Sequence, residues 1–243
     1  MTSPLELVDP SYADVRARRR RTTNEALKAA ANVLVSQHGV ATRGQLIECG
    51  MSPRQIERRL WEGRLDGVAR GVYVLRVTPD TWERRAVAAV LVTAIRAYPG
   101  ALSHESAAAS WGINGFERGG QIIMTAPSGD RHVNPLAVMS RAADLLPEDV
   151  VVGPLGVATT SIVRTVLDLA VRTSNPAALE RLMDRVLADD RIALADLRAR
   201  AQDMAGRAGI IAARKELNRR KRMARRARPK RSKRCSSSES IAA

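Results

Sequence analysis

The sequence is poor in cysteine, histidine and aromatic residues. Its 243 residues include two cysteines and three histidines, and aromatic side chains make up 3%. Two cysteines are too few for a disulfide framework or a four-ligand zinc site, and the histidines are scattered along the chain. The sequence also has no phosphate-cradling glycine loop and no nucleophile-elbow motif. We therefore expect neither a metal site nor a cofactor.

Long apolar segments are missing as well. The longest apolar stretch, residues 86–95, is bounded by arginines and is much shorter than the ~18 residues that a membrane span needs. The N-terminal residues MTSPLELVDPSYADV have no basic flank followed by an apolar core and a small-residue cleavage site. The sequence therefore predicts a cytoplasmic protein that does not cross a membrane.

Positive charge is abundant and is concentrated near the C-terminal end. The net charge is +15, and residues 214–234 hold thirteen Lys or Arg against one Glu. A block of like charge gains too little from burial to offset its ordering entropy, so we expect a basic tail at 214–243, mostly disordered and at least so from Arg219. Such a tail binds polyanions by counterion release, and its lack of aromatic residues favours duplex DNA over single strands. The alternative is a tail that only improves solubility or reflects a frame-altered end of the gene.

The first part of the chain has the pattern of a winged helix-turn-helix. After a basic arm at 1–21, which we expect to be disordered, three helices are predicted between Thr22 and Gly63, the second and third opening with capping boxes. Glycines separate the helices, and Pro53 takes the first position of the third. Residues 64–77 alternate around glycines like a two-stranded ribbon with its tip at Arg70 and Gly71. We assign 22–78 to this DNA-binding domain.

A second domain is predicted at 79–213. Long helical patterns alternate with three apolar segments of strand character, at 121–127, 132–140 and 150–153. The overall fold class is therefore mixed α/β: a winged helix-turn-helix, an α/β domain and a basic tail.

Side chains suited to a DNA groove gather on the third helix. With Ile56 and Leu60 on the buried side, Arg58 lies opposite them and Arg54 beside it. Arginine can bridge two acceptors of guanine, and glutamine can bridge the edge of adenine. The predicted DNA-contacting residues are Arg43, Ser52, Arg54, Gln55, Arg58, Arg59 and Arg70.

Roles within this set follow from position. Arg43, at the start of the second helix, suits a phosphate, and Arg70, at the wing tip, suits a phosphate or the minor groove. Trp61 fits a partly buried site under the wing better than a base contact. The alternative for Arg54 and Arg58 is a merely solvated helix face.

The run SHES, residues 103–106, is the one candidate for catalysis. A serine beside a histidine suggests a nucleophile and its base, yet neighbouring residues on a helix point about 100° apart. A helix start explains the run better, with Ser103 as the cap and Glu105 near the positive helix end. Asp168 and the pair Asp189 and Asp190 are likewise interpreted as helix-surface groups, so we expect no enzymatic activity.

Three runs of the sequence carry a resemblance to a known family. They are VLVSQHGVATRGQLIECGMSPRQIERRLWEGRLDGVARGVYVL, ALSHESAAASWGI and GVATTSIVRTVLDLA. They resemble the AbiEi-type antitoxins of bacterial type IV toxin-antitoxin systems and their actinobacterial relatives, over roughly residues 25–205.

The resemblance implies a function as well as a fold. In that family a winged helix binds operator DNA, usually inverted repeats, in the protein's own promoter. The following α/β domain supports repression and neutralises a nucleotidyltransferase toxin. The partners implied are therefore double-stranded operator DNA and such a toxin, and the DNA-contacting role falls on Arg43, Arg54, Gln55, Arg58 and Arg70.

Two alternatives to this function stay open. Many relatives with a SHESAA-like segment continue into a Vsr-like endonuclease domain, whereas here the basic tail and SSSES stand in its place from about Arg219. This departure argues against nuclease activity and leaves a remnant of an endonuclease-associated protein as one alternative. The other is a toxin-binding or protein-binding module in which DNA binding is accessory.

Overall fold

The computed structural model describes residues 10–94, 99–129, 133–188, 191–204 and 209–227. The chain divides into two compact units, Met1–Leu169 and Ala170–Ala243, with the division inside helix α6. The described part is mixed α/β and contains two β-sheets, as the sequence predicts.

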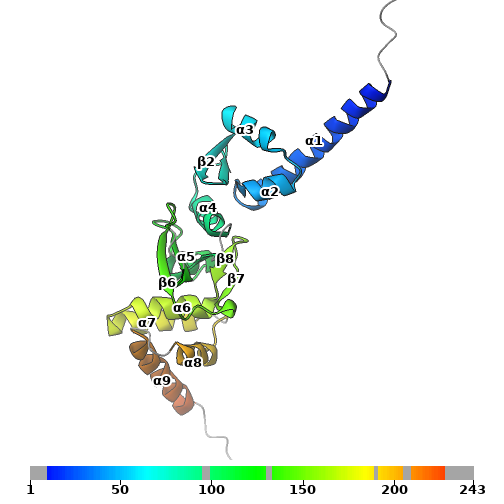
Figure 1. Cartoon of the computed structure of the whole chain (residues 1–243). Coiled ribbons are helices and arrows are strands. Elements are labelled where there is room, and N and C mark those ends of the chain that lie inside the picture. The colour runs from blue at the N-terminus through cyan, green and yellow to red at the C-terminus, as the bar shows by residue number, and fades with distance from the viewer. Residues whose placement is uncertain (1–9, 95–98, 130–132, 189–190, 205–208, 228–243) are drawn as a thin grey trace, which may run out of the picture. The chain divides into compact units, whose positions relative to one another are not determined.

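The first unit begins with three helices and a hairpin in the element order of a winged helix-turn-helix (Figure 1). The elements are α1 (Pro10–Ser36), β1 (Val40–Thr42), α2 (Arg43–Glu48), α3 (Pro53–Trp61), β2 (Leu65–Ala69) and β3 (Val72–Leu75). The three strands form an antiparallel sheet in the order β1-β3-β2.

Local sequence signals set the ends of these elements. Thr42 and Ser52 each open a helix with a complete capping box. Gly50 and Gly71 adopt φ of +91° and +74° at the turns after α2 and between β2 and β3, a region that glycine enters without strain. Helices α1, α2 and α3 then bury a small core that includes Leu34, Leu46, Ile56 and Tyr73.

The rest of the first unit is a five-stranded sheet with helices. Its elements are α4 (Trp82–Ala94), β4 (Ala101–Leu102), α5 (His104–Trp111), β5 (Ile123–Pro127), β6 (Val138–Ala142), the 3-10 turn η1 (Pro147–Asp149), β7 (Val150–Val152), β8 (Ala158–Thr160) and α6 (Ile162–Arg172). The strand order is β6-β5-β4-β8-β7, with parallel pairs β4/β8 and β5/β6. The short strands β4 and β8 have no counterpart in the sequence expectation, because two or three residues give too little alternation to detect.

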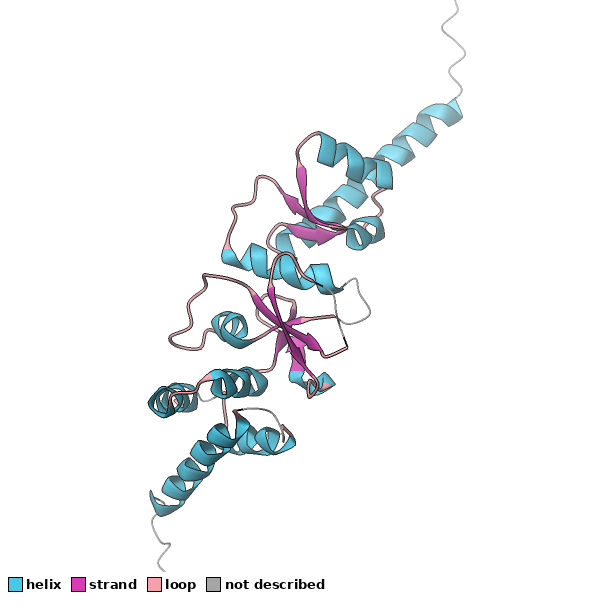
Figure 2. Ribbon diagram, turned by 60° about the vertical axis from the view of Figure 1, so that its left-hand side comes forward, coloured by secondary structure: helices cyan, strands magenta, loops and turns pink. Residues whose placement is uncertain are grey.

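Helix α4 belongs to the packing of both sheets. It contacts β1 and β3 of the first sheet and β4 of the second, and Figure 2 shows it between the two groups of strands. Its residues from Ala86 to Thr93 are all buried, which is the pattern of a helix covered on every side. One apolar cluster therefore runs from Val40 and Val74 through α4 to Leu102 and Met124.

This shared cluster crosses the predicted domain boundary at residue 78/79. The sequence predicts two domains, 22–78 and 79–213, and the contacts place the three-stranded and the five-stranded sheet in one unit, Met1–Leu169. The physical reason is the buried stretch of α4 from Ala86 to Thr93: it is almost entirely apolar, and each sheet covers part of it.

The second unit consists of helices. After α6, α7 (Pro176–Leu187), α8 (Leu194–Asp203) and α9 (Ile210–Ala227) follow, and α9 packs against α7 and α8. The helical patterns that the sequence shows at 161–172, 176–190 and 193–205 correspond to α6, α7 and α8. Asp189 and Asp190, predicted at the helix surface, lie outside the described residues.

Parts of both ends that we expected to be disordered are helical in the structure. Helix α1 begins at Pro10 rather than Thr22, so most of the expected arm at 1–21 is helical. Helix α9 continues to Ala227, so the basic tail is not disordered from Arg219. Residues 228–243 lie outside the described part of the chain.

Ion pairs explain why α9 continues beyond Arg219. The Arg219 guanidinium donates to Glu216 at 2.7 Å and to Glu180 of α7 at 2.5 Å. Arg220 donates to Glu216 at 2.6 Å and pairs with Asp184 of α7 at 2.7 Å. The start of the basic block is thus neutralised by acidic residues of α7 and of the preceding turn of α9, and it can remain helical.

None of the helices in the described part of the chain combines the length and the apolar character needed to span a membrane.

Candidate nucleic-acid interface

The exposed side of α3 carries a stripe of long side chains. Arg54, Arg58 and Trp61 follow one another at spacings of four and three residues and are exposed, while Ile56 is fully buried on the other side. Residues at these spacings lie on one helix face. The predicted orientation of Arg54 and Arg58 is therefore the one that the structure has.

Arg58 is held along the helix by an ion pair. Its Nε donates to Glu62 Oε1 at 2.6 Å, and Arg58 is 75% exposed in its side chain. The hydrogen bond from Arg58, helped by the charges of Arg58, Arg64 and Arg59, lowers the pKa of Glu62. An exposed pair of this kind contributes little to stability, so a stronger acceptor can replace Glu62 as the partner of Arg58.

The Gln55 side chain is occupied by the capping box. Its Oε1 accepts the N–H of Ser52 at 2.8 Å, and the Ser52 hydroxyl accepts the N–H of Gln55 at 3.3 Å. A bidentate adenine contact needs both the oxygen and the NH₂ of the amide. In this structure Gln55 and Ser52 therefore fix the start of α3, and the base-reading role predicted for Gln55 would require the capping box to open.

Arg59 faces a different direction from Arg58. It is half-buried, its Nη1 donates to the carbonyl of Gln55 at 3.0 Å, and it lines a small apolar cavity with Leu27 and Leu65. Burial lowers the pKa of its guanidinium. This side chain is turned toward the cavity, and the structure does not bring it to the exposed stripe.

Arg43 joins the stripe to the wing. Its Nη2 lies 3.8 Å from Oε1 of Glu57, which sits between Arg54 and Arg58 on α3. Its backbone N–H donates to the carbonyl of Gly71 at 2.8 Å, directly after Arg70 at the wing turn. A hydrogen bond with Tyr73 is the main cause that raises the pKa of the Arg43 guanidinium. One residue of α2 thus contacts both α3 and the turn of the hairpin.

Arg70 is exposed at the turn between β2 and β3. The contact of its neighbour Gly71 with Arg43 places this turn beside the start of α2. We refer to Arg43, Arg54, Arg58, Trp61 and Arg70 as the helix-wing surface.

Trp61 corrects a prediction. The sequence places it partly buried under the wing, but it is 89% exposed. At the last position of α3 it falls on the outer stripe, three residues after Arg58, because the buried side is filled by Ile56 and Leu60.

The SHES segment is more closely joined than expected. Ser103 has extended backbone, with φ of −146°, and His104 has φ of +50°, so their side chains meet and His104 Nδ1 lies 2.9 Å from Ser103 Oγ. Ser103 also accepts from Thr125 Oγ1 at 2.8 Å and makes no capping hydrogen bond, in contrast to its predicted role. Ser103 and His104 are 0% and 2% exposed.

A buried ion-pair cluster around Arg164 was not predicted from the sequence. Arg164 is 0% exposed and donates to Asp168 at 3.0 Å, to Asp149 at 2.9 Å and to Asp144 at 3.2 Å. Asp168, predicted at a helix surface, is therefore a core residue. The spacing of Arg164 and Asp168 on one helix was visible in the sequence, but the two other carboxylates come from the turn before β7.

Among the described residues, no group of three or more His, Cys, Asp or Glu side chains is arranged to hold a metal ion.

The fold and the helix-wing surface together define a helix-turn-helix protein with a basic outer face. Residues 29–76 match the family described as "Transcriptional regulator, AbiEi antitoxin", which confirms the AbiEi-type resemblance for this segment. This segment is thus similar to a family of antitoxins and transcriptional regulators. The runs ALSHESAAASWGI and GVATTSIVRTVLDLA lie outside the matched residues.

Comparison with solved structures gives a crystal structure of the RV2827C protein from Mycobacterium tuberculosis. It is 18% identical, with a TM-score of 0.48, and the match covers 79% of this chain and 76% of that one. No curated protein matches the sequence.

Proposed function

We propose that this protein is a DNA-binding transcriptional regulator that represses its own promoter in the bacterial cytoplasm. The observation that carries the proposal is the double contact of Arg43, with Glu57 on α3 and with Gly71 at the wing. This double contact supports an arrangement in which the arginines of α3 and the arginine of the wing turn face the same DNA. The family described for residues 29–76 supports this function.

Each arginine has a distinct role in this proposal. Arg54 and Arg58 reach base edges from α3 in the major groove, where arginine bridges O6 and N7 of guanine. Arg43 and Arg70 contact phosphates on either side and fix the register of α3 without reading sequence. On binding, a guanine edge takes the place of Glu62 as the acceptor of Arg58.

The test compares two exposed, ion-paired arginines. Arg58→Ala should weaken binding to a fragment of the protein's own promoter by about 1–3 kcal/mol and leave binding to random DNA nearly unchanged. Arg118→Ala is the matched control, because Arg118 is also exposed and pairs with Glu83 at 3.1 Å, outside the helix-wing surface. Fluorescence anisotropy titrations at fixed salt give both affinities. Equal losses on promoter and random DNA for Arg58→Ala would refute its role in reading bases.

Neutralisation of a nucleotidyltransferase toxin is the second proposed function, favoured by the antitoxin description of the matched family. Co-expression of the full chain with the product of the adjacent gene should yield a complex and restore growth. Neither a complex nor rescue would argue against this function.

We also propose that the protein is not an enzyme. The burial of Ser103 and His104, at 0% and 2% exposure, supports this, because a nucleophile and its base need access to a substrate. DNA cleavage by the purified chain in Mg²⁺ or Mn²⁺ would overturn the proposal and favour a relation to endonucleases.

A further inference from the structure

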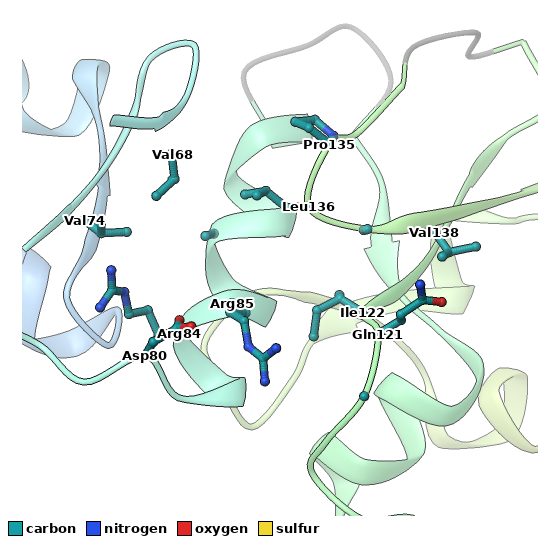
Figure 3. Close-up of a pocket in the computed structure, with 13 residues that line it drawn as sticks. Val68, Val74, Asp80, Arg84, Arg85, Gln121, Ile122, Pro135, Leu136 and Val138 are labelled. Atoms are coloured by element: carbon teal, nitrogen blue, oxygen red, sulfur yellow. The ribbon is translucent and has the colours of Figure 1, made fainter. Parts of the chain in front are cut away.

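A cavity of about 680 Å³ lies beside the wing, and none of the residues of the helix-wing surface lines it. It is formed within the first unit by the hairpin, the start of α4 and two segments next to β5 and β6 (Figure 3). Its apolar lining residues include Val68, Val74, Ala88, Ile122, Leu136 and Val138. Sites for small molecules have volumes of roughly 300–1,000 Å³ and mostly apolar walls with a few polar groups.

The polar groups of this cavity carry a net positive charge. Arg84, Arg85 and Asp80 line it, which sums to +1. The Arg84 guanidinium already donates to the carbonyl of Thr78, so it is fixed in place by the backbone. Arg85 lines the cavity and is exposed, and in the described part of the chain no ion pair involves it. Figure 3 shows both arginines on α4, with the hairpin on one side and the Ile122 segment on the other.

We propose that this cavity binds a small apolar carboxylate. Arg85 is the counter-ion of the carboxylate, and the valines, Ile122 and Leu136 enclose the hydrocarbon part. A monoanion balances the +1 charge of the lining, whereas a phosphate dianion would leave a negative charge beside Asp80. An apolar neutral molecule would leave Arg85 without the charge-assisted hydrogen bonds that make such pairs strong.

The position of the site links it to the wing. Val68 lies on β2 and Val74 on β3, the two strands that lead to Arg70 at the turn. A bound molecule adds apolar contacts between these strands and α4, so it changes the freedom of the hairpin. This coupling, which rests on the proposed function, predicts that ligand and operator DNA alter each other's affinity by the same factor.

Isothermal titration calorimetry of the full chain tests the site without DNA. The probe is 4-phenylbutyrate, and its neutral amide, 4-phenylbutyramide, is the comparison. We expect saturable one-to-one binding of the acid, with the amide at least about tenfold weaker because it lacks the charge that Arg85 pairs with. Equal affinities for acid and amide, or no saturation by the acid, would overturn the proposal.

Two pairs of variants locate the binding. Arg85→Gln should weaken binding of 4-phenylbutyrate about tenfold, to the affinity of the amide. Arg70→Gln, outside the cavity, should leave binding of the acid unchanged. Val138→Trp, at a half-exposed position of the lining, should block binding, whereas Val152→Trp on the edge strand β7 should not. Circular dichroism spectra establish that each variant is folded. Undiminished binding by folded Val138→Trp would place the probe elsewhere and overturn the assignment.

Promoter titrations with and without saturating 4-phenylbutyrate test the coupling. A promoter affinity that changes with 4-phenylbutyrate supports the coupling. An unchanged promoter affinity, with the acid still binding in calorimetry, refutes the coupling but not the binding site. Failure of the ligand-free protein to bind its promoter contradicts the proposed function, whatever the calorimetry shows.

Discussion

At the scale of single residues, charged side chains of this protein fall into two energetic classes. Arg58 and Arg43 make exposed or long ion pairs that cost little to break. Arg164 is fully buried, and its three carboxylate partners come from α6 and from the turn before β7. The first class can exchange a protein acceptor for a nucleic-acid acceptor, whereas the second ties elements together.

Replacement of Arg164 should destabilise the fold much more than replacement of an exposed arginine. Arg164→Met leaves Asp144, Asp149 and Asp168 close together without their cation, and we expect a loss of about 3–5 kcal/mol in the free energy of unfolding. Urea denaturation measures the loss, and Arg181→Met, at an exposed position of α7, is the control.

Additional removal of the carboxylate charges separates electrostatics from packing. Asp144→Asn with Asp168→Asn should recover part of the stability that Arg164→Met removes. A loss below about 1 kcal/mol in the single variant would contradict the role assigned to Arg164.

At the scale of elements, α3 and α9 both place arginines near glutamates, with different results. On α3 the pair Arg58 and Glu62 lies within one helix. On α9 the pairs extend to α7, through Arg219 with Glu180 and Arg220 with Asp184. The α9 pairs therefore stabilise the packing of two helices in the second unit.

The α9 pairs predict an acid-dependent stability. Hydrogen bonds from Arg219 are the largest cause that lowers the pKa of Glu216 in the folded chain. A carboxyl whose pKa is lowered by folding stabilises the fold above its unfolded pKa and loses that contribution as the pH falls through the folded value. The difference in stability between the wild type and Glu216→Gln should therefore be largest near neutral pH. It should shrink toward zero as the pH falls below the usual pKa range of glutamate.

Thermal melts at a series of pH values measure this gap. Glu148→Gln, at an exposed position of η1, should show no comparable pH-dependent difference. A gap for Glu216→Gln that stays constant to acid pH would show that Glu216 acts through packing and not through charge.

At the scale of the whole molecule, the basic residues considered for DNA binding lie in two places. The helix-wing surface contributes four arginines, and residues 228–243 contribute five Lys or Arg. The basic residues of α9 that pair with α7 are structural, so a truncation meant to test DNA affinity has to begin after Ala227.

Deletion of residues 228–243 should weaken binding to all DNA sequences alike. The salt dependence of binding should become shallower, by up to about 0.9 in the log-log slope for each phosphate that the shortened chain no longer neutralises. Titrations of promoter and random DNA across a salt series measure both effects. A selective decrease in affinity for the promoter alone would mean that these residues read sequence.

Local signals made much of the helix-turn-helix part predictable. The capping boxes at Thr42 and Ser52 and the glycine turns act over three or four residues, so the printed sequence contains both partners of each interaction. The exposed stripe of Arg54 and Arg58 follows from the helical period alone. The tie of Gln55 to Ser52 was equally visible, and it competes with the base-reading role predicted for the same residue.

Residues whose partners lie far along the chain could not be placed in this way. Asp168 belongs to a core ion pair because Asp144 and Asp149 surround the same arginine. Trp61 is exposed because Ile56 and Leu60 already fill the inner side of α3. Arg219 stays in a helix because Glu180 faces it from α7.

The sequence by itself determined the starts of α2 and α3, the turns, the face of α3 that carries arginine, and the resemblance of residues 29–76 to the AbiEi-type family, because these depend on neighbours within a few positions. The tertiary structure decided which charges are buried, that α4 joins both sheets in one unit, and that a cavity opens beside the wing. Burial and ion pairing between distant segments depend on which surfaces meet, and hydrophobic patterning specifies that a face is covered without specifying what covers it.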